Sequence, residues 1–204
     1  MVIVIKQEIT VDVAAPIRQD VRNRPDIFVA RQFLSPSECA SWIALSEASG
    51  FRPAPIHTPS GPQRVAEVRN NERLIRDDPE LARLWWTRCR NLQLQSFGRW
   101  RAVGLNERFR FYRYRQGQQF AIHRDGSYRR SADEMSWMTL MVYLNEDFDG
   151  GETRFYPLNA EPLTIRPQTG MALVFMHDRA HEGAPVLRGN QYVLRTDIMY
   201  RRER

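Results

Sequence analysis

The chain has 204 residues, of which 42% are hydrophobic, and this length and composition suit one domain with a single core. No apolar run reaches the roughly 18 residues of a membrane-spanning helix, so no membrane span is expected. The net charge is +6, but the arginines are scattered and Lys6 is the only lysine, so a nucleic-acid partner is not expected either.

The N-terminal segment and the two cysteines indicate a cellular compartment. The opening Met-Val-Ile-Val-Ile is short, is followed by Lys6 and Glu8, and lacks the basic start and the cleavage site of a signal peptide. Cys39 and Cys89 lie among apolar residues on predicted helix faces, which indicates buried thiols rather than a disulfide. These features predict a cytoplasmic protein in a reducing environment.

Two helices are predicted in the first hundred residues. The run Ser-Pro-Ser-Glu at residues 35–38 is typical of a capped helix start, and Gly50 stops this helix. The run Asp-Pro-Glu at residues 78–80 begins a second helix, whose apolar residues recur at helical spacing up to Leu92. We expect both helices to pack on the outside of a β core, with residues 1–108 forming a helical support. Residues 52–66 are rich in proline and predict a loop.

The second half of the chain is predicted to be all β. Residues 109–115, 137–144, 171–176 and 191–200 are rich in aromatic, β-branched or other apolar side chains. The run Asp-Gly-Gly at residues 149–151 predicts a tight turn between two strands. Several strands separated by turn signals are typical of a jelly roll.

A possible metal site lies within this β region. His123 and Asp125 are two residues apart, so on an extended segment both side chains project from the same face. His181 lies far along the chain, and it can join them only if a second strand folds back beside the first. Two histidines and one carboxylate leave three positions open on an octahedral Fe(II), as an oxygen-activating iron requires. His177, four residues before His181, is the competing histidine.

The residues around these ligands carry a longer pattern. Arg-Tyr-Arg-Gln-Gly precedes His123, Tyr-Leu-Asn and Gly-Gly-Glu-Thr-Arg-Phe follow Asp125, and His-Glu-Gly-Ala-Pro-Val contains His181. This ordered series over residues 109–200 resembles the prolyl-4-hydroxylase-like branch of the Fe(II)/2-oxoglutarate dioxygenases. The resemblance implies a double-stranded β-helix, or distorted jelly roll, over residues 109–204. It also implies His123, Asp125 and His181 as the ligands of Fe(II), with 2-oxoglutarate and O2 as cosubstrates.

The same resemblance assigns residues to 2-oxoglutarate. Tyr114 and Tyr143 occupy positions whose hydroxyls contact 2-oxoglutarate in the family, the alternative for each being an aromatic residue packed in the barrel. Members of the branch usually carry Lys or Arg nine or ten residues after the last histidine, where this chain has Asn190 and the neutral Gln191. A neutral amide makes no charge-assisted pair with the 5-carboxylate. We therefore expect Arg195 to bind that carboxylate in place of Gln191, the alternative being an Arg held in a salt bridge with Asp197.

The resemblance implies a hydroxylase that couples decarboxylation of 2-oxoglutarate to C–H hydroxylation, most simply of a prolyl or other side chain in a peptide or protein. The alternatives are a hydroxylase of a free amino acid or small natural-product intermediate, and a non-catalytic jelly-roll binding module. Ascorbate is a possible accessory reductant. In the resembling enzymes a segment like residues 52–66 closes over the substrate, so either a lid or a plain connection fits here. Substrate identity and oligomeric state are not encoded in readable motifs.

Overall fold

The computed structural model describes residues 15–21, 24–58, 61–158 and 160–203. The expectation that the chain opens without a signal peptide concerns residues outside these ranges. Among the described residues, none of the helices combines the length and the apolarity needed to cross a membrane.

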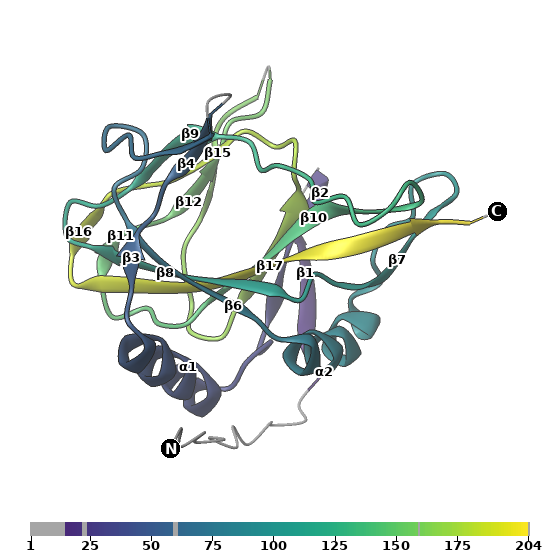
Figure 1. The fold of residues 1–204 in the computed structure, drawn as a ribbon, viewed down its shortest axis with the longest axis horizontal. Helices are drawn as coiled ribbons and strands as arrows, with labels where there is room; N and C mark the ends of the chain where they lie inside the picture. The colour runs from purple at the N-terminus through teal and green to yellow at the C-terminus, as the bar shows by residue number, and fades with distance from the viewer. Residues whose placement is uncertain (1–14, 22–23, 59–60, 159, 204) are drawn as a thin grey trace.

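A large antiparallel sheet forms the body of the protein (Figure 1). Its strand order is β1-β2-β14-β10-β17-β8-β6-β3, and β7 also pairs with β17. The strands are β1 (Ile17–Val21), β2 (Arg24–Arg31), β3 (Arg52–Pro53), β6 (Glu72–Asp77), β7 (Trp100–Leu105), β8 (Arg108–Arg115), β10 (Glu134–Tyr143), β14 (Ala172–Met176) and β17 (Asn190–Arg202).

A smaller sheet faces the large one and completes the jelly roll. Its order is β13-β12-β15-β9. The pairs β11-β16 and β4-β5 form two separate two-stranded sheets. The strands are β4 (Ile56–Thr58), β5 (Gly61–Gln63), β9 (Phe120–His123), β11 (Asp149–Gly150), β12 (Thr153–Phe155), β13 (Leu163–Ile165), β15 (His181–Gly183) and β16 (Val186–Arg188). The mainly β, jelly-roll fold expected from the sequence is confirmed.

Both predicted helices are present, together with a short 3-10 turn, η1 (Arg90–Leu92). In α1 (Pro36–Ser49), Ser35 and Glu38 form the expected capping box and Gly50 ends the helix. In α2 (Pro79–Cys89), the Asp78 side chain accepts a hydrogen bond from the backbone N–H of Leu81. Figure 1 shows both helices on one face of the large sheet, while β9, β12 and β15 lie on the other.

The N-terminal half contains more strand than the sequence indicated. The description of residues 1–108 as a helical support was incomplete, because β1, β2, β3, β6 and β7 all join the large sheet. The expected loop at residues 52–66 likewise contains β3 and the β4-β5 hairpin. β1, β3 and β7 each pair with a single strand, β4 and β5 pair only with each other, and most of β6 is paired on one side only. Exposed polar residues and prolines are tolerated at such positions and hide the strand pattern.

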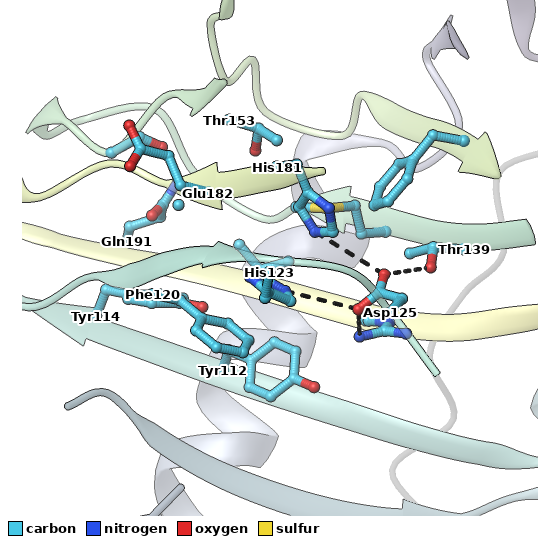
Figure 2. Close-up of a pocket in the computed structure, with 16 residues that line it drawn as sticks. Tyr112, Tyr114, Phe120, His123, Asp125, Thr139, Thr153, His181, Glu182 and Gln191 are labelled. Atoms are coloured by element: carbon cyan, nitrogen blue, oxygen red, sulfur yellow. Dashed lines mark hydrogen bonds and ion pairs between the residues drawn. The ribbon is translucent and has the colours of Figure 1, made fainter. Parts of the chain in front are cut away.

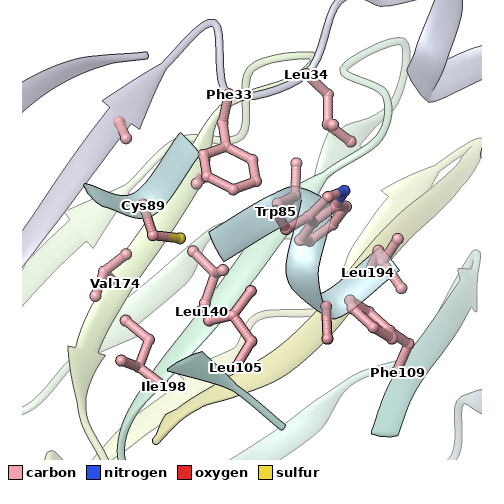
Figure 3. Close-up of a cluster of buried hydrophobic side chains, with 14 of the residues drawn as sticks. Phe33, Leu34, Trp85, Cys89, Leu105, Phe109, Leu140, Val174, Leu194 and Ile198 are labelled. Atoms are coloured by element: carbon pink, nitrogen blue, oxygen red, sulfur yellow. The ribbon is translucent and has the colours of Figure 1, made fainter. Parts of the chain in front are cut away.

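Alternate residues of the central strands supply two separate cores. Phe111, Leu140, Val174 and Leu194 face the helices, and Figure 3 shows Trp85 of α2 packed among such side chains. The ring of Trp85 meets Phe33 and Phe109 edge to face at centroid distances of 5.2 and 5.4 Å. The other face of the same strands supplies the second core. The helices therefore seal one face of the large sheet and leave the other to line a site.

Candidate metal centre and cosubstrate pocket

The three predicted metal ligands come together between the two sheets (Figure 2). His123 ends β9 and His181 begins β15, and these two residues are directly paired across the small sheet. Asp125 follows β9, where its backbone N–H donates to the carbonyl of His177 at 2.9 Å. One candidate ligand atom from each residue lies within 4.8 Å of the others. The second strand therefore folds back beside the first, as the spacing required.

Hydrogen bonds orient both imidazoles toward Asp125. Nδ1 of His123 lies 2.8 Å from the carbonyl of Ala121, and Nδ1 of His181 lies 2.9 Å from that of Arg179. A carbonyl only accepts, so each Nδ1 carries the proton and each Nε2 keeps a free lone pair. Those Nε2 atoms lie 3.7 Å and 3.9 Å from the carboxylate oxygens of Asp125. Burial lowers the pKa of His181 to about 4, which keeps this ring neutral and ready to ligate a metal.

Asp125 is held by two residues of the large sheet. Arg195 of β17 donates from Nη1 to Oδ1 at 2.7 Å, and Thr139 of β10 donates from Oγ1 to Oδ2 at 2.6 Å. Burial raises the pKa of the Asp125 carboxyl, but Arg195 and the two histidines outweigh it and hold the pKa well below its usual value. The carboxylate is therefore ionised and fixed in position before any metal binds.

His177, the competing histidine, does not belong to the group of side chains whose candidate ligand atoms converge. Its ring is buried, with Nδ1 3.0 Å from Oγ1 of Thr139 and Nε2 2.9 Å from Oγ of Ser136. Both ring nitrogens are thus engaged by hydroxyls. The geometry places His177 as a support for Thr139, and it leaves His181 as the candidate ligand.

Aromatic side chains form the walls around the ligands. Phe120 stacks on His123 at a centroid distance of 3.5 Å, and Phe175 meets His181 edge to face at 4.6 Å. Tyr112 belongs to β8, and the guanidinium carbon of Arg69 lies over its ring, 4.7 Å from the ring centroid. Burial raises the pKa of the Tyr112 hydroxyl, but Arg69, Arg195 and Arg110 outweigh it and leave the pKa below its usual value. The wall that Tyr112 forms therefore lies in the positive field of these three arginines.

A pocket opens beside the triad. Tyr114 and Gln191, which are paired across β8 and β17, line it together with Thr153 and Arg195. Tyr143 lies just behind this surface, where its hydroxyl forms a 2.6 Å hydrogen bond with that of Thr153. The structure thus brings all the sequence-predicted residues to one pocket or its immediate wall.

The sequence analysis missed several residues of this site. Thr139 is a polar residue within an apolar strand, and that contrast was the available signal for it. Thr153 stands in the Gly-Gly-Glu-Thr-Arg-Phe run that carries the family resemblance. Gly151 has a positive φ of 67°, and a Cβ there would meet the Gln191 side chain at 3.0 Å. Phe120 occupies the aromatic position of the motif that precedes His123. Tyr112 carried no distinguishing signal, because strand aromatics usually pack in a core.

The donor set fits Fe(II). Two imidazole nitrogens and one carboxylate on neighbouring strand ends can occupy one face of an octahedron and leave the pocket side free. The oriented histidines and the doubly hydrogen-bonded carboxylate meet the requirement for supported ligands. A 2-oxo acid can use the remaining positions through its carboxylate and keto oxygens.

Comparison with known proteins agrees with this geometry. The family model described as the 2OG-Fe(II) oxygenase superfamily matches residues 109–196, which carry all three ligands. Residues 109–196 are a 2OG-Fe(II) oxygenase domain. The family expected from the sequence is thereby confirmed. A search of curated proteins found no match to this oxygenase.

Solved structures share the fold of the oxygenase. A viral collagen prolyl hydroxylase from Paramecium bursaria Chlorella virus-1, in complex with 2-oxoglutarate, is 20% identical with a TM-score of 0.60 over 88% of this chain and 99% of that one. A prolyl-4-hydroxylase from Pseudomonas putida is 17% identical with a TM-score of 0.61 over 87% and 93%. A Trichoplax adhaerens prolyl hydroxylase, in complex with a hypoxia inducible factor peptide, is 17% identical with a TM-score of 0.64 over 85% and 83%. At these identities the likeness establishes the shared fold alone.

Proposed function

We propose that the protein is an Fe(II)- and 2-oxoglutarate-dependent hydroxylase of the prolyl-4-hydroxylase-like branch. The observation that carries this proposal is the convergence of His123, Asp125 and His181 within the oxygenase domain. Their lone pairs point to one place, and aromatic walls shield that place from water. The intact ligand set argues against a non-catalytic binding module.

The bound iron and 2-oxoglutarate would supply the oxidising chemistry, in which the cosubstrate is decarboxylated to succinate and one oxygen atom is transferred to a C–H bond. The chain itself supplies geometry. His123 and His181 turn their Nε2 atoms toward the metal position, and Asp125 supplies the negative charge. Arg195 and Thr139 keep that carboxylate from rotating, and Phe120 fixes the plane of the His123 ring.

We propose a prolyl or other side chain of a peptide or protein as the substrate. The support is that structures sharing this fold include prolyl hydroxylases, one of them bound to a peptide. A free amino acid or small natural-product intermediate is the alternative substrate class. Ascorbate is proposed as an accessory reductant. The free, buried thiols of Cys39 and Cys89 support the cytoplasm as the compartment.

A substrate screen tests this function. The protein would be incubated with Fe(II), 2-oxoglutarate and ascorbate, with proline-containing peptides in one series and free amino acids in another. Mass spectrometry should detect a gain of one oxygen on a peptide, coupled to succinate formation. Hydroxylation of free amino acids alone would contradict the peptide assignment. Asp125→Ala, which removes a ligand, is the control for non-enzymatic oxidation by free iron.

A further inference from the structure

The face of the large sheet that carries the pocket continues beyond it onto β8 and β6, which lie side by side (Figure 1). Tyr112 and Arg195 line the pocket, and each is directly paired with an arginine on the next strand outward. Arg73 of β6 pairs with Tyr112, and Arg110 of β8 pairs with Arg195. Ile75 of β6 in turn pairs with Arg110. Directly paired residues share one face of a sheet, so these side chains extend the pocket surface outward.

We call Arg73, Ile75 and Arg110 the β6–β8 patch. It is open to solvent, because Ile75 is 41% exposed, the side chain of Arg110 is 21% exposed and Arg73 is half-buried. Leu74, which lies between Arg73 and Ile75, points to the opposite face and packs against the core under the helices. The patch therefore combines two guanidinium groups and one exposed apolar side chain beside the pocket.

The positive charge of the β6–β8 patch is only partly balanced. Arg110 pairs with Asp197 at 3.2 Å, but Asp197 also pairs with Arg195. Other arginines of β6 and β8 have carboxylate partners of their own, whereas Arg73 has none among the residues that the structure describes. Burial lowers the pKa of Arg73, and the guanidinium of Arg69 lowers it further. Arg73 nevertheless stays charged at neutral pH, so a carboxylate placed beside it would be stabilised.

Arg69 belongs to the wall of the pocket and not to the patch. Its guanidinium carbon lies 4.7 Å and 4.2 Å from the ring centroids of Tyr112 and Phe120, and its Nε donates to Oδ1 of Asn71 at 2.8 Å. Its Nη2 is buried and has no hydrogen-bond partner, which favours an anionic group inside the pocket. An anion held there leaves Arg73 and the outer surface free for a second one.

We propose that the β6–β8 patch binds an acidic side chain of a peptide substrate, so that the oxygenase prefers target residues with Asp or Glu nearby in sequence. The proposal rests on the proposed function, because it assumes that a peptide is hydroxylated at the metal. A guanidinium binds a carboxylate through two parallel hydrogen bonds, and Ile75 can contact the methylene groups of the same side chain. β6 lies two strands, or about 10 Å, from β17, and an extended peptide advances about 3.3 Å per residue. The acidic residue should therefore lie within about three residues of the hydroxylated one.

Peptide pools test this preference. Each pool has a randomised central residue and carries Asp, Asn or Lys at one of the three positions on either side. The pools are incubated with the protein, Fe(II) and 2-oxoglutarate, and mass spectrometry measures the initial rate of oxygen gain at low peptide concentration. At the preferred position we expect the Asp pool to react about tenfold faster than the Asn pool, and the Lys pool to react slowest. The ratio should shrink at high salt, because partly exposed charges are screened.

Charge reversal at Arg73 tests the assignment to the patch. Arg73→Glu should make the Lys pool react faster than the Asp pool, whereas a general loss of stability would slow all pools alike. Arg73→Met should remove most of the preference for Asp. Arg76→Met is the matched control, because Arg76 lies on the opposite face of β6 and pairs with Asp78, and it should keep the wild-type preference.

Equal rates for the Asp and Asn pools in the wild type would overturn the proposal, whether or not the variants fold. Formation of succinate without hydroxylation of any pool would overturn it as well. A preference for Asp that survives in Arg73→Glu would show that the β6–β8 patch is not the binding surface. Faster oxidation of single-stranded oligonucleotides than of any peptide pool would identify nucleic acid as the anionic substrate instead. Absence of succinate with and without peptide would overturn the proposed function itself.

Discussion

Arg195 donates a hydrogen bond of 2.7 Å from Nη1 to Oδ1 of Asp125, the only carboxylate of the candidate iron site. The same guanidinium reaches Asp197 at 3.2 Å, and its Nε has no hydrogen-bond partner. Burial lowers the pKa of Arg195, but the two carboxylates outweigh it and raise the pKa above its usual value. This ion pair links the large sheet to the metal ligand.

The first prediction concerns this link. Arg195→Met should weaken Fe(II) binding in the absence of any 2-oxo acid by about ten- to a hundredfold, because Asp125 loses the group that orients it. Calorimetry with Fe(II), or with Mn(II) as a redox-stable substitute, measures this. Arg110→Met is the control, since Arg110 pairs with Asp197 but not with Asp125. If Arg195 instead binds the 5-carboxylate of 2-oxoglutarate, as expected from the sequence, metal affinity would stay unchanged and only 2-oxoglutarate binding would weaken.

Thr139 provides the second prediction. Thr139→Val keeps the side-chain shape but removes the hydroxyl that bonds both Asp125 and His177. Loss of this hydroxyl leaves buried polar atoms unpaired, so the free energy of unfolding should fall by about 1–3 kcal/mol. Metal affinity should fall as well. Thr139→Ser should restore both quantities, and a Val variant with wild-type metal affinity would show that Thr139 has only a packing role.

The third prediction concerns the pH dependence of stability in the metal-free protein. The pKa of His181 is about 4 in the folded state, below the usual 6.5, because burial disfavours the charged ring. Below pH 6.5 the unfolded chain binds a proton that the folded chain does not, so stability falls as pH falls from 6.5 toward 4. The loss attributable to His181 is at most about 3 kcal/mol. Urea unfolding of wild type and His181→Gln between pH 4 and 7 measures it, and parallel curves for the two proteins would contradict the assignment.

The fourth prediction concerns the β4-β5 hairpin within residues 52–66. If this hairpin closes over the substrate, shortening it should depress substrate hydroxylation more than uncoupled succinate formation, because the metal ligands lie on other strands. Bound substrate should also protect the hairpin from protease more than 2-oxoglutarate does. Equal loss of both activities, with cleavage unaffected by substrate, would identify the segment as a plain connection.

The fold was predictable where local signals agree with tertiary structure. The caps at Ser35 and Asp78, the four apolar strand segments and the ligand spacing each have a local physical cause, and the structure confirms the elements they predict. The strands β1, β3 and β6 were not predictable. Their exposed residues dilute the alternation of apolar side chains, and the pairing of β6 with β8 joins segments distant in sequence.

The candidate site was likewise predictable only in part. The convergence of His123, Asp125 and His181 could be predicted because the first two are two residues apart and the run after His181 belongs to the same family pattern. The engagement of Arg195 by Asp125 could not, because it depends on how β17 lies relative to the loop after β9. Whether an arginine is free to bind a ligand depends on its partners, and the sequence does not name them.

The most direct test of the central claim is Fe(II)-dependent formation of succinate from 2-oxoglutarate in air, measured by NMR at saturating 2-oxoglutarate. We expect succinate from the wild type, background levels from His181→Ala, and activity above background from His177→Ala. The reason is that His181 is a candidate metal ligand, whereas His177 only supports Thr139. Absence of succinate from a wild-type protein that binds Fe(II), or activity retained by His181→Ala and lost by His177→Ala, would contradict it.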